Sequence, residues 1–337
     1  MQEEKRILYI CNLQNTFTDI DEQILRERYE VHKVYVEKKN LKFIFQTWSA
    51  LQKTDVIVAW FASWHSLPAF LMASLLRKPR ILITGGYDVA NNPEIAYGLR
   101  QGGLPYIISD LVFRLTTLAL PFSETATNEA LKNTPLAQSK IQTLRLGVSD
   151  NYKDKAFSKK FLNPLIITVG GIEAVSIRRK GIREFILAAK HLPNAEFVVV
   201  GKHIDHSIDN LREIASENVT FTGYISDDDL DKLFQEAQVY VQASYHEGFG
   251  LSVAEAMLAE CIPVVSENGS LPEVVGDTGF YIDEISPENI ASYIQKALAD
   301  NTNLANKARQ RILDLFSIEA RKQGLHHAIE SVFRKSI

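Results

Sequence analysis

The sequence has few cysteines: only Cys11 and Cys261 occur in 337 residues. Two thiols cannot form the disulfide framework of a small secreted scaffold, and both lie in apolar surroundings. We therefore expect two buried free thiols and a reducing compartment. Low-complexity tracts are also lacking, and a composition that is 46% hydrophobic and 23% charged excludes a largely disordered or collagen-like chain.

A long hydrophobic run is missing as well. The first residues, MQEEKR followed by ILYIC, lack the apolar core and cleavage site of a signal peptide and predict a short buried strand. The longest apolar stretch, 107–122, is interrupted by Asp110 and Arg114 and falls short of the roughly 20 residues that span a bilayer. These absences predict a cytoplasmic protein.

Neither charge sign is in strong excess. The chain carries 37 Lys and Arg against 41 Asp and Glu, a net charge of −4 that gives no indication of nucleic-acid binding. Residues 1–150 have a net charge of +2 and residues 151–337 a net charge of −6. This mild asymmetry fits two halves that face different partners.

Short apolar runs alternate with segments of helical periodicity along the whole chain. Strands are predicted at 7–11, 31–36, 56–60, 80–84, 118–122, 165–169, 196–200, 219–222, 239–242, 262–265 and 280–282. Helices are predicted at 19–28, 41–53, 66–76, 105–117, 181–191, 207–216, 227–237, 251–259 and 287–300, and two more between 309 and 335. Strands and helices that alternate at this spacing predict parallel sheets covered on both faces.

The length indicates two domains, each doubly wound α/β. Residues 146–163 are rich in Lys, Ser and Asp and show little apolar periodicity, which predicts an interdomain linker. Two such domains place a ligand in a cleft where the carboxyl ends of their strands face each other.

The densest chemical signal is the string Ser244–Leu251, between a predicted strand and a predicted helix. Gly248 and Gly250 leave backbone N–H groups open at the positive end of that helix, which is a natural seat for phosphate. Glu255 shares a helical stripe with apolar residues, and its carboxylate needs a partner such as the hydroxyls of a ribose. Glu247, in the preceding loop, could accept hydrogen bonds from a second sugar. The alternative is a simple turn with solvated glutamates.

A second cluster is Arg178, Arg179 and Lys180, which are predicted to open a helix at Gly181. Basic side chains normally avoid a helix N-terminus, so three in a row favour a bound anion. The alternative is a solvated basic loop. Together with the glycine-rich loop, the cluster predicts a diphosphate site with Lys180 as a point charge.

These motifs give the second half a resemblance to a known family. It resembles the nucleotide-sugar-binding domain of the large retaining glycosyltransferase family (group 1, GT4-like), whose two glutamates with seven residues between them are matched by Glu247 and Glu255. The surrounding EGFGLSVAEAM, the PVV at 263–265, the GSLPE at 269–273 and the pair Lys180-Gly181 also match. Thinner similarity extends to residues 78–88 and to the C-terminal FSIEARKQGLHHAIESVF.

The resemblance implies the GT-B architecture, two Rossmann-like parallel-sheet domains that face each other across a cleft. Residues 1–150 with 317–337 would bind the acceptor, and residues 151–316 would bind the nucleoside diphosphate sugar. The family retains anomeric configuration and holds the diphosphate without a metal, so neither metal nor cofactor is expected.

The resemblance also implies roles for single residues. Glu255 would hold the ribose and Glu247 the transferred sugar, whereas Lys180 and the backbone of Phe249, Gly250 and Leu251 would hold the diphosphate.

Several positions depart from the family pattern. Gly171 stands where an Arg is usual, so that Arg178 or Arg179 would compensate, and Gly85 stands where many members have a His. The usual glycine-rich loop after the first strand is replaced by 12–17, in which Asn15 and Thr16 could cap a helix and reach a phosphate. Glu260 replaces a usual Gly and is expected to be a surface change.

Gly85 and two further residues of the first half, His65 and Asp88, are candidate acceptor or sugar contacts. His65 is near the end of a predicted strand and could activate an acceptor, with a structural His as the alternative. Asp88 follows Gly85 and Gly86 and could touch a sugar, with a turn-stabilising Asp as the alternative.

The leading hypothesis is transfer of a hexose from a UDP- or GDP-linked donor to a glycan, lipid-linked or small-molecule acceptor. The alternatives are a nucleotide-sugar epimerase or hydrolase of the same shape and a binding-only relative. A peripheral membrane contact of 105–122 near Arg100 and Arg114 is open, but burial against its own sheet is preferred.

Overall fold

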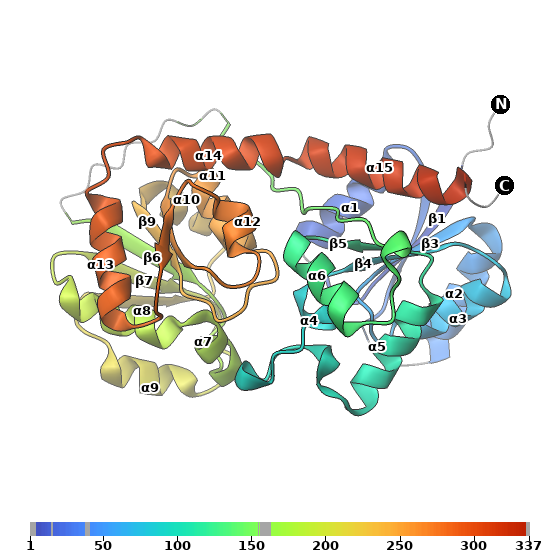
Figure 1. The fold of residues 1–337 in the computed structure, drawn as a ribbon, viewed down its shortest axis with the longest axis horizontal. Helices are drawn as coiled ribbons and strands as arrows, with labels where there is room; N and C mark the ends of the chain where they lie inside the picture. The colour runs from blue at the N-terminus through green and yellow to red at the C-terminus, as the bar shows by residue number, and fades with distance from the viewer. Residues whose placement is uncertain (1–4, 15, 38–40, 154, 156–162, 335–337) are drawn as a thin grey trace. The chain divides into compact units, whose positions relative to one another are not determined.

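The computed structural model describes residues 5–14, 16–37, 41–153, 155 and 163–334 (Figure 1). The chain divides into two compact units. Unit 1 comprises Met1–Gly147 and Ile318–Ile337, and unit 2 comprises Val148–Ser317. Among the described helices, none has both the length and the apolar character that crossing a membrane requires.

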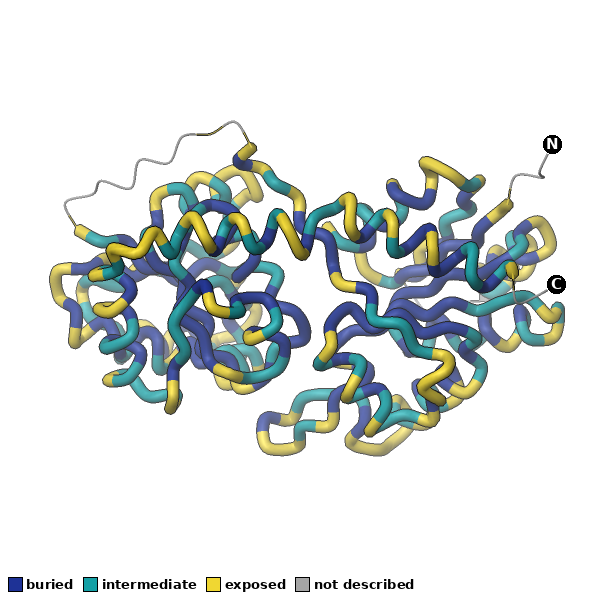
Figure 2. Tube along the Cα trace, turned by 45° about the horizontal axis from the view of Figure 1, so that its top comes forward, coloured by how far each residue is buried: buried dark blue, intermediate teal, exposed yellow. Residues whose placement is uncertain are grey.

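Unit 1 is built on a parallel sheet with the strand order β2-β1-β3-β4-β5. Its strands are β1 Arg6–Cys11, β2 Glu30–Tyr35, β3 Val56–Trp60, β4 Arg80–Thr84 and β5 Leu118–Pro121. The central strands are apolar runs buried on both sides, as parallel sheets between helix layers require (Figure 2).

Helices cover both faces of this sheet. They are α1 Thr16–Arg26, α2 Leu41–Lys53, α3 Ser66–Leu75, α4 Gly86–Val89, α5 Gly103–Leu115, α6 Glu124–Asn133 and α15 Ile318–Arg334, with 3₁₀ turns at Pro93–Ile95, Leu99–Gln101 and Gln138–Lys140. Helices α1 and α15 lie on one face, and α2, α3 and α5 lie on the other (Figure 1). This division follows from right-handed crossovers in a sheet of this order.

Unit 2 has a parallel sheet with the order β11-β10-β9-β6-β7-β8. The chain adds β7 and β8 on one side of β6 and then adds β9, β10 and β11 on the other side, so the strand order reverses between β6 and β9. The strands are β6 Leu165–Val169, β7 Glu196–Val200, β8 Val219–Gly223, β9 Val239–Gln242, β10 Ile262–Ser266 and β11 Phe280–Ile282. The helices are α7 Ala174–Lys180, α8 Ile182–Ala188, α9 Ser207–Ile214, α10 Asp227–Glu236, α11 Leu251–Leu258, α12 Leu271–Val275, α13 Pro287–Leu298 and α14 Leu304–Leu315, with a 3₁₀ turn at Ala189–His191.

The predicted fold class, two doubly wound parallel-sheet units, is confirmed, and every predicted strand occurs with its ends within one residue. Sequence periodicity missed four short helices, α4, α6, α7 and α12. Three of them span seven residues or fewer, too short for an apolar period to show. Helix α6 was missed because its sequence ETATNEALKN carries few apolar residues.

The segment 146–163, predicted to be an interdomain linker, contains the boundary between the two units at Gly147 and Val148, but its described residues are packed rather than solvated. Leu146, Val148 and Tyr152 are buried. The Tyr152 hydroxyl donates a hydrogen bond to Asp231 Oδ1 at 2.7 Å, and Asp150 forms an ion pair with Arg309 at 2.7 Å. Apart from residue 155, positions 154–162 lie outside the described residues.

A buried ion pair fastens the last helix to unit 1. Arg321 on α15 makes two hydrogen bonds to the carboxylate of Asp21 on α1, at 2.9 and 2.7 Å, and both side chains are almost fully buried. A third guanidinium nitrogen donates to the backbone carbonyls of Leu144 and Arg145. Loss of either partner would leave a buried charge, so α15 is tied to two segments far away in sequence.

The backbone explains why glycine suits position 260. Glu260 ends α11 in the left-handed region with φ +61°, and its N–H donates to the Met257 carbonyl at 3.0 Å. A side chain in this conformation costs about 1 kcal/mol relative to glycine.

Replacing Glu260 by glycine should therefore raise the free energy of unfolding by about 1 kcal/mol, because the strain of a left-handed residue disappears. Urea unfolding of the wild type, Glu260→Gly and Glu260→Ala measures it. Alanine keeps the strain, so equal stabilisation by both substitutions would contradict this explanation.

Candidate active site

The two sequence clusters of unit 2 meet at the carboxyl ends of β6 and β9. These strands are neighbours in the sheet, and the strand order reverses between them. The loop after β6 leads through Gly170 and Gly171 into α7, and the loop after β9 runs from Ala243 to Gly250 into α11. A reversal of this kind leaves a crevice above the strand ends, where doubly wound proteins bind ligands.

The basic cluster directly precedes α8, the helix predicted to begin at Gly181, but it also ends α7, which the sequence did not predict, so the helix dipole alone gives no reason to infer an anion here. Arg178, Arg179 and Lys180 form the last turn of α7, where cations are favoured because the dipole is negative. Gly181, with φ +63°, then turns the chain into α8. Its position is crowded, since a Cβ there would lie 2.2 Å from the Ala243 carbonyl oxygen.

Lys180 lies across the end of β6. Its Nζ donates a hydrogen bond to the carbonyl oxygen of Val169 at 3.0 Å, and a Cβ at Gly170 would lie only 2.7 Å from the Lys180 Cδ. Burial lowers the pKa of Lys180, and the carboxylate of Glu247 acts in the opposite direction. The glycine thus leaves the room that the lysine stem needs, and the acidic neighbour favours its charged form.

Arg179 joins the basic cluster to the loop after β9. Its backbone carbonyl accepts a hydrogen bond from the Tyr245 N–H at 2.7 Å, and its Nη1 donates to the His246 carbonyl at 3.2 Å. Nη1 also lies 3.7 Å from Glu247 Oε2, and both side chains are mostly buried. Arg179, Lys180 and Glu247 therefore form one cluster.

The glycine-rich loop is fixed at its entry to α11. Gly250 adopts φ +92° and is buried, as are Gly248 and Phe249. The Phe249 ring packs on Phe316 with ring centroids 5.6 Å apart. Leu251 then begins the helix and leaves the first N–H groups of α11 without intrahelical acceptors.

A supporting loop that sequence reasoning did not assign a role lies between β10 and α12. Ser266 Oγ and Asn268 Nδ2 donate to the Ser244 carbonyl, and Ser270 Oγ donates to the Gly248 carbonyl. The Ser270 N–H donates to the Glu247 carbonyl at 2.9 Å. The signal was a run of small polar residues directly after a buried strand, and this run holds the backbone of the glycine-rich loop.

Glu255 is an acidic residue of unit 2 with little electrostatic compensation. It lies on α11 with two buried neighbours, Ala254 and Ala256, and among the described residues its carboxylate has no hydrogen-bond or ion-pair partner. Burial, followed by the nearby carboxylates of Asp231 and Asp227, raises its pKa to about 8. A carboxylate kept in such surroundings is typical of a functional site.

The departure at Gly171 also has a local explanation. A Cβ at this position would lie 3.0 Å from Cδ1 of Ile204, whose side chain occupies the adjacent space. A long side chain here would require Ile204 to move. In this chain Arg179 supplies the positive charge near the loop after β9 instead.

The candidate residues of unit 1 lie in tightly packed loops. His65 has no exposed surface, its Nε2 lies 2.7 Å from the Trp60 carbonyl oxygen, and burial lowers its pKa to about 4. Asp88 is buried and accepts hydrogen bonds from the N–H groups of Gly85 at 2.8 Å and Ala62 at 3.0 Å. Burial raises its pKa to about 6. These contacts favour the structural alternatives for both residues.

Gly85 and the loop after β1 complete the candidate list. A Cβ at Gly85 would lie 2.3 Å from the Phe122 ring, which fills the space that a larger residue would need. Thr16 is exposed and begins α1, whereas Asn15 lies outside the described residues.

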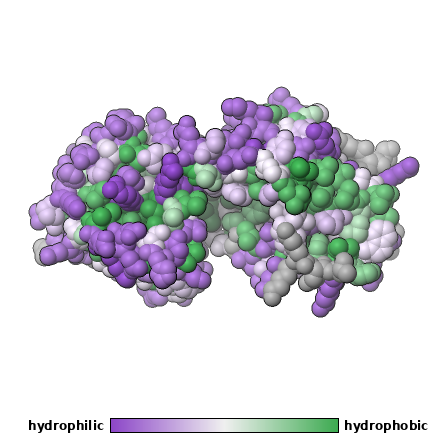
Figure 3. Space-filling model, turned by 90° about the horizontal axis from the view of Figure 1, so that it is seen from below, coloured by the Kyte–Doolittle hydropathy of each residue, from purple (hydrophilic) through white to green (hydrophobic). Residues whose placement is uncertain are grey.

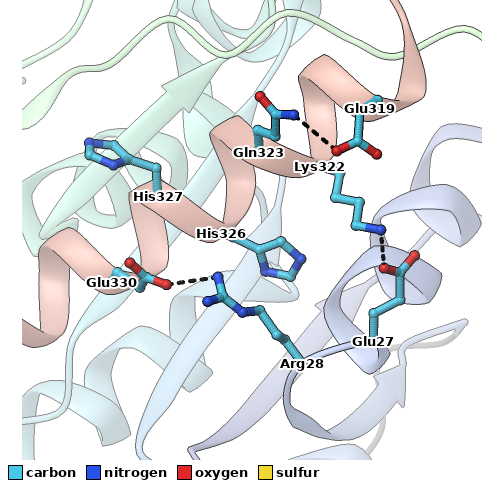
Figure 4. Close-up of a pocket in the computed structure, with 8 residues that line it drawn as sticks. All are labelled: Glu27, Arg28, Glu319, Lys322, Gln323, His326, His327 and Glu330. Atoms are coloured by element: carbon cyan, nitrogen blue, oxygen red, sulfur yellow. Dashed lines mark hydrogen bonds and ion pairs between the residues drawn. The ribbon is translucent and has the colours of Figure 1, made fainter.

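A groove of about 430 Å³ lies on unit 1, between α15 and the end of α1 (Figure 4). Ion pairs join Lys322 to Glu27 and Arg28 to Glu330 along it. His326 is buried, and its ring packs beside that of Tyr29 with the ring centroids 5.6 Å apart. None of the candidate site residues lines this groove.

The supporting loop predicts a specific cost for a substitution. A Cβ at Gly269, where φ is +64°, would lie 2.2 Å from the Glu247 carbonyl oxygen, so that Gly269→Ala adds a clash to backbone strain. Gly223 is a matched control, because its φ is +70° but its nearest neighbour would be 4.0 Å away. We expect Gly223→Ala to lower the free energy of unfolding by about 1 kcal/mol and Gly269→Ala by about 3 kcal/mol, measured by urea unfolding. An equal decrease in the free energy of unfolding of both variants would show that the Glu247 carbonyl does not clash with a side chain at position 269.

Comparison with known proteins places these features in a family. The family described as "Glycosyl transferases group 1" matches residues 153–313, nearly all of unit 2. The O-antigen chain mannosyltransferase B of Escherichia coli is 41% identical over 85 residues, which is 25% of this chain and 22% of that protein. The GDP-Man:Man(3)GlcNAc(2)-PP-Dol alpha-1,2-mannosyltransferase of Dictyostelium discoideum is 34% identical over 118 residues, 32% of this chain and 23% of that protein. The matched part thus spans about a quarter of the length of these curated relatives.

The fold comparison covers the whole chain. The structure of HepE from Anabaena in complex with UDP and glucose superposes with a TM-score of 0.79 at 15% sequence identity, covering 97% of this chain and 100% of that one. This similarity shows the GT-B fold, and the predicted architecture is confirmed. Residues 153–313 thus match the group 1 glycosyltransferases, the GT4-like family, and the chain as a whole has the GT-B fold.

Proposed function

We propose that this glycosyltransferase moves a hexose from a nucleoside diphosphate sugar to a saccharide acceptor with retention of anomeric configuration. The observation that carries the proposal is the convergence of Arg179, Lys180 and Glu247 on the glycine-rich loop at the strand-order reversal of unit 2. Cations, the N-terminal end of α11 and a carboxylate in one place match the parts of such a donor.

The diphosphate would bind between the basic cluster and the start of α11. The Lys180 ammonium and the Arg179 guanidinium lie beside the loop that presents the backbone of Phe249, Gly250 and Leu251. As the bond to the sugar breaks, negative charge grows on the leaving diphosphate, and prearranged cations and N–H groups stabilise it. We assign Lys180 as the catalytic cation of this step.

The two glutamates would hold the two sugars of the donor. The carboxylate of Glu247, oriented by Arg179 and by the supporting loop, would accept hydrogen bonds from hydroxyls of the transferred hexose. The partnerless Glu255 would accept hydrogen bonds from the ribose hydroxyls, which would remove the cost of its buried charge. In both roles a carboxylate accepts hydrogen bonds that the hydroxyl groups of a sugar donate.

The relatives narrow the donor and the acceptor to be tested first. One carries GDP-mannose and a lipid-linked saccharide in its name, and the other is named for mannosyl transfer to O-antigen chains. We therefore propose GDP-mannose as the donor and a lipid-linked or free glycan as the acceptor. Since two cations serve the diphosphate, we propose that transfer needs no metal ion.

An assay of nucleotide release tests the proposal. GDP and UDP release from a panel of GDP- and UDP-hexoses is measured with glycan and lipid-linked acceptors, with and without EDTA, and the anomeric proton of the product is read by NMR. We expect one donor class to be used, EDTA to have no effect, and the product to keep the donor's configuration. Donor binding without any modified acceptor would contradict the transferase and support a binding-only protein.

Lys180→Met should lower kcat about 100-fold or more, because the developing charge on the diphosphate loses its cation. Lys190, an exposed lysine of the same unit, supplies the matched control Lys190→Met. A similar fall in kcat in both variants, or an unchanged kcat in both, would contradict the role of Lys180.

Glu255→Gln should weaken binding of the nucleoside diphosphate at least tenfold and, in the absence of donor, stabilise the protein. A carboxyl group whose pKa is raised to about 8 on folding contributes stability below its unfolded pKa and loses it as the pH rises toward 8. The wild type should therefore lose on the order of 2 kcal/mol more than Glu255→Gln between pH 5 and pH 8. Urea unfolding across this range and titration calorimetry measure the two effects. A variant that is less stable at pH 8 than the wild type would contradict an uncompensated carboxylate.

A further inference from the structure

The groove between α15 and the end of α1 lies at the amino ends of the strands of unit 1. Glu27 and Arg28 follow the last residue of α1, and Glu30 then begins β2 beside Arg6, the first residue of β1. Doubly wound units bind ligands at the opposite, carboxyl ends of their strands. The groove is therefore separate from the edge of the sheet where an acceptor is expected.

The groove is also unlike the other covered face of the sheet. Figure 3, which views the molecule from the side where α2, α3 and α5 lie in Figure 1, shows a broad apolar area on unit 1. Charged and polar side chains of the first loop and of α15 line the groove instead (Figure 4). Its ligand must therefore be bound by polar contacts.

His326 on α15 is a buried polar side chain that lines this groove. It is 6% exposed, and Figure 4 shows its ring directed into the groove between Arg28 and Lys322. Within the described part of the chain, neither ring nitrogen of His326 has a hydrogen-bond partner, and the buried hydroxyl of the adjacent Tyr29 also has none. Because buried polar atoms are normally hydrogen-bonded, the imidazole needs a partner from outside the chain.

The charges around His326 compensate one another. Lys322 pairs with Glu27 on one side of the ring, and Arg28 pairs with Glu330 at 2.8 Å on the other. Burial, followed by the positive charge of Arg28, lowers the pKa of His326, so that near neutral pH its uncharged ring offers one donor and one acceptor. A charged ligand would compete with one of these ion pairs, whereas an uncharged one can bind between them.

The lining narrows the chemistry of that ligand. Glu319 adds a third carboxylate to the two cations, which disfavours an anion. No group of three or more His, Cys, Asp or Glu side chains in the described residues is arranged to hold a metal ion. Sugar hydroxyls donate and accept at once, which matches the neutral imidazole and the exposed Gln323 and His327 beside it. The volume of about 430 Å³ suits a small ligand.

We propose that this groove is a saccharide-binding site separate from the candidate active site, in which the His326 imidazole exchanges hydrogen bonds with sugar hydroxyls between the two ion pairs. A structural histidine has a partner within the protein, as His65 has in the Trp60 carbonyl. A free sugar and a segment of a glycan chain both present the required hydroxyls. The inference does not rest on the proposed transfer, since binding here needs no turnover.

NMR of the full chain with ¹⁵N-labelled histidine tests this site. The ring nitrogens of His326 are identified by the loss of their signals in His326→Leu. They are then followed while mannose, glucose, galactose, a mannose tetrasaccharide or inorganic phosphate is added to millimolar concentrations. We expect a saccharide to shift both nitrogens. A shift with a single hexose would identify a free sugar as the ligand, and a shift with the tetrasaccharide alone would identify a glycan segment.

Gln323→Trp should raise the Kd of that saccharide about tenfold or more, because an exposed ring on α15 fills the groove without changing the core. Gln310→Trp is the matched control: Gln310 is an exposed residue of α14 in unit 2 that, like Gln323, bonds a carboxylate one turn away. It should bind as the wild type does. His326→Leu should also lose binding, read from the signals of His327, yet unfold at a urea concentration no lower than the wild type, since it removes polar atoms without partners.

The absence of any His326 shift with all four saccharides would overturn the proposal, as would equal Kd values for Gln323→Trp and Gln310→Trp. A shift with phosphate alone would assign the groove to an anion and overturn it too. A marked loss of stability in His326→Leu would show that the protein itself satisfies the imidazole, which also contradicts the proposal.

Discussion

The candidate site depends on the contacts that join the last turn of α7 to the ends of β6 and β9. Lys180 donates a hydrogen bond to the carbonyl oxygen of Val169, the last residue of β6, and Arg179 makes hydrogen bonds to the backbone of the loop after β9. Without these contacts the cations would be an exposed basic turn, and the glycine-rich loop would lose one of its two supports. The other support is the set of hydroxyl and amide groups that follows β10. A parallel sheet with one reversal of strand order is what brings all three loops to the same edge.

The sequence predicts most of the fold because the strands of both units are buried apolar runs that only a parallel sheet between helices accommodates. It fails where helices are short or polar. The failure matters at α7: with that helix missed, Arg178–Lys180 were interpreted only as residues that precede the helix beginning after Gly181, whereas they also form the last turn of α7. A seven-residue helix has about two turns, which is too short for the spacing of its apolar residues to show that a helix is present. The buried segment around Tyr152 was missed for a related reason, because its apolar residues are isolated among polar ones.

The sequence also predicts the composition of the candidate site, but not its energetics. The spacing of apolar residues predicts that Glu255 lies on an apolar stripe of its helix. Only the structure shows that the carboxylates of Asp231 and Asp227, in addition to burial, raise its pKa. His65 and Asp88 look similar to site residues in the sequence, yet their partners are backbone groups of their own loops. A residue that stabilises a turn and one that binds a ligand have the same sequence signal. They differ in whether the protein itself satisfies their hydrogen bonds, as it does for Asp88 and does not for Glu255.

The central claim is that the edge of unit 2 above β6 and β9 binds a nucleoside diphosphate. A crystal structure of the protein with GDP tests it most directly. We expect the diphosphate to lie within hydrogen-bond distance of Lys180 Nζ and of the first N–H groups of α11, and the ribose hydroxyls to donate to the carboxylate of Glu255. A nucleotide bound elsewhere, or bound at this edge with Glu255 still unpartnered, would contradict it.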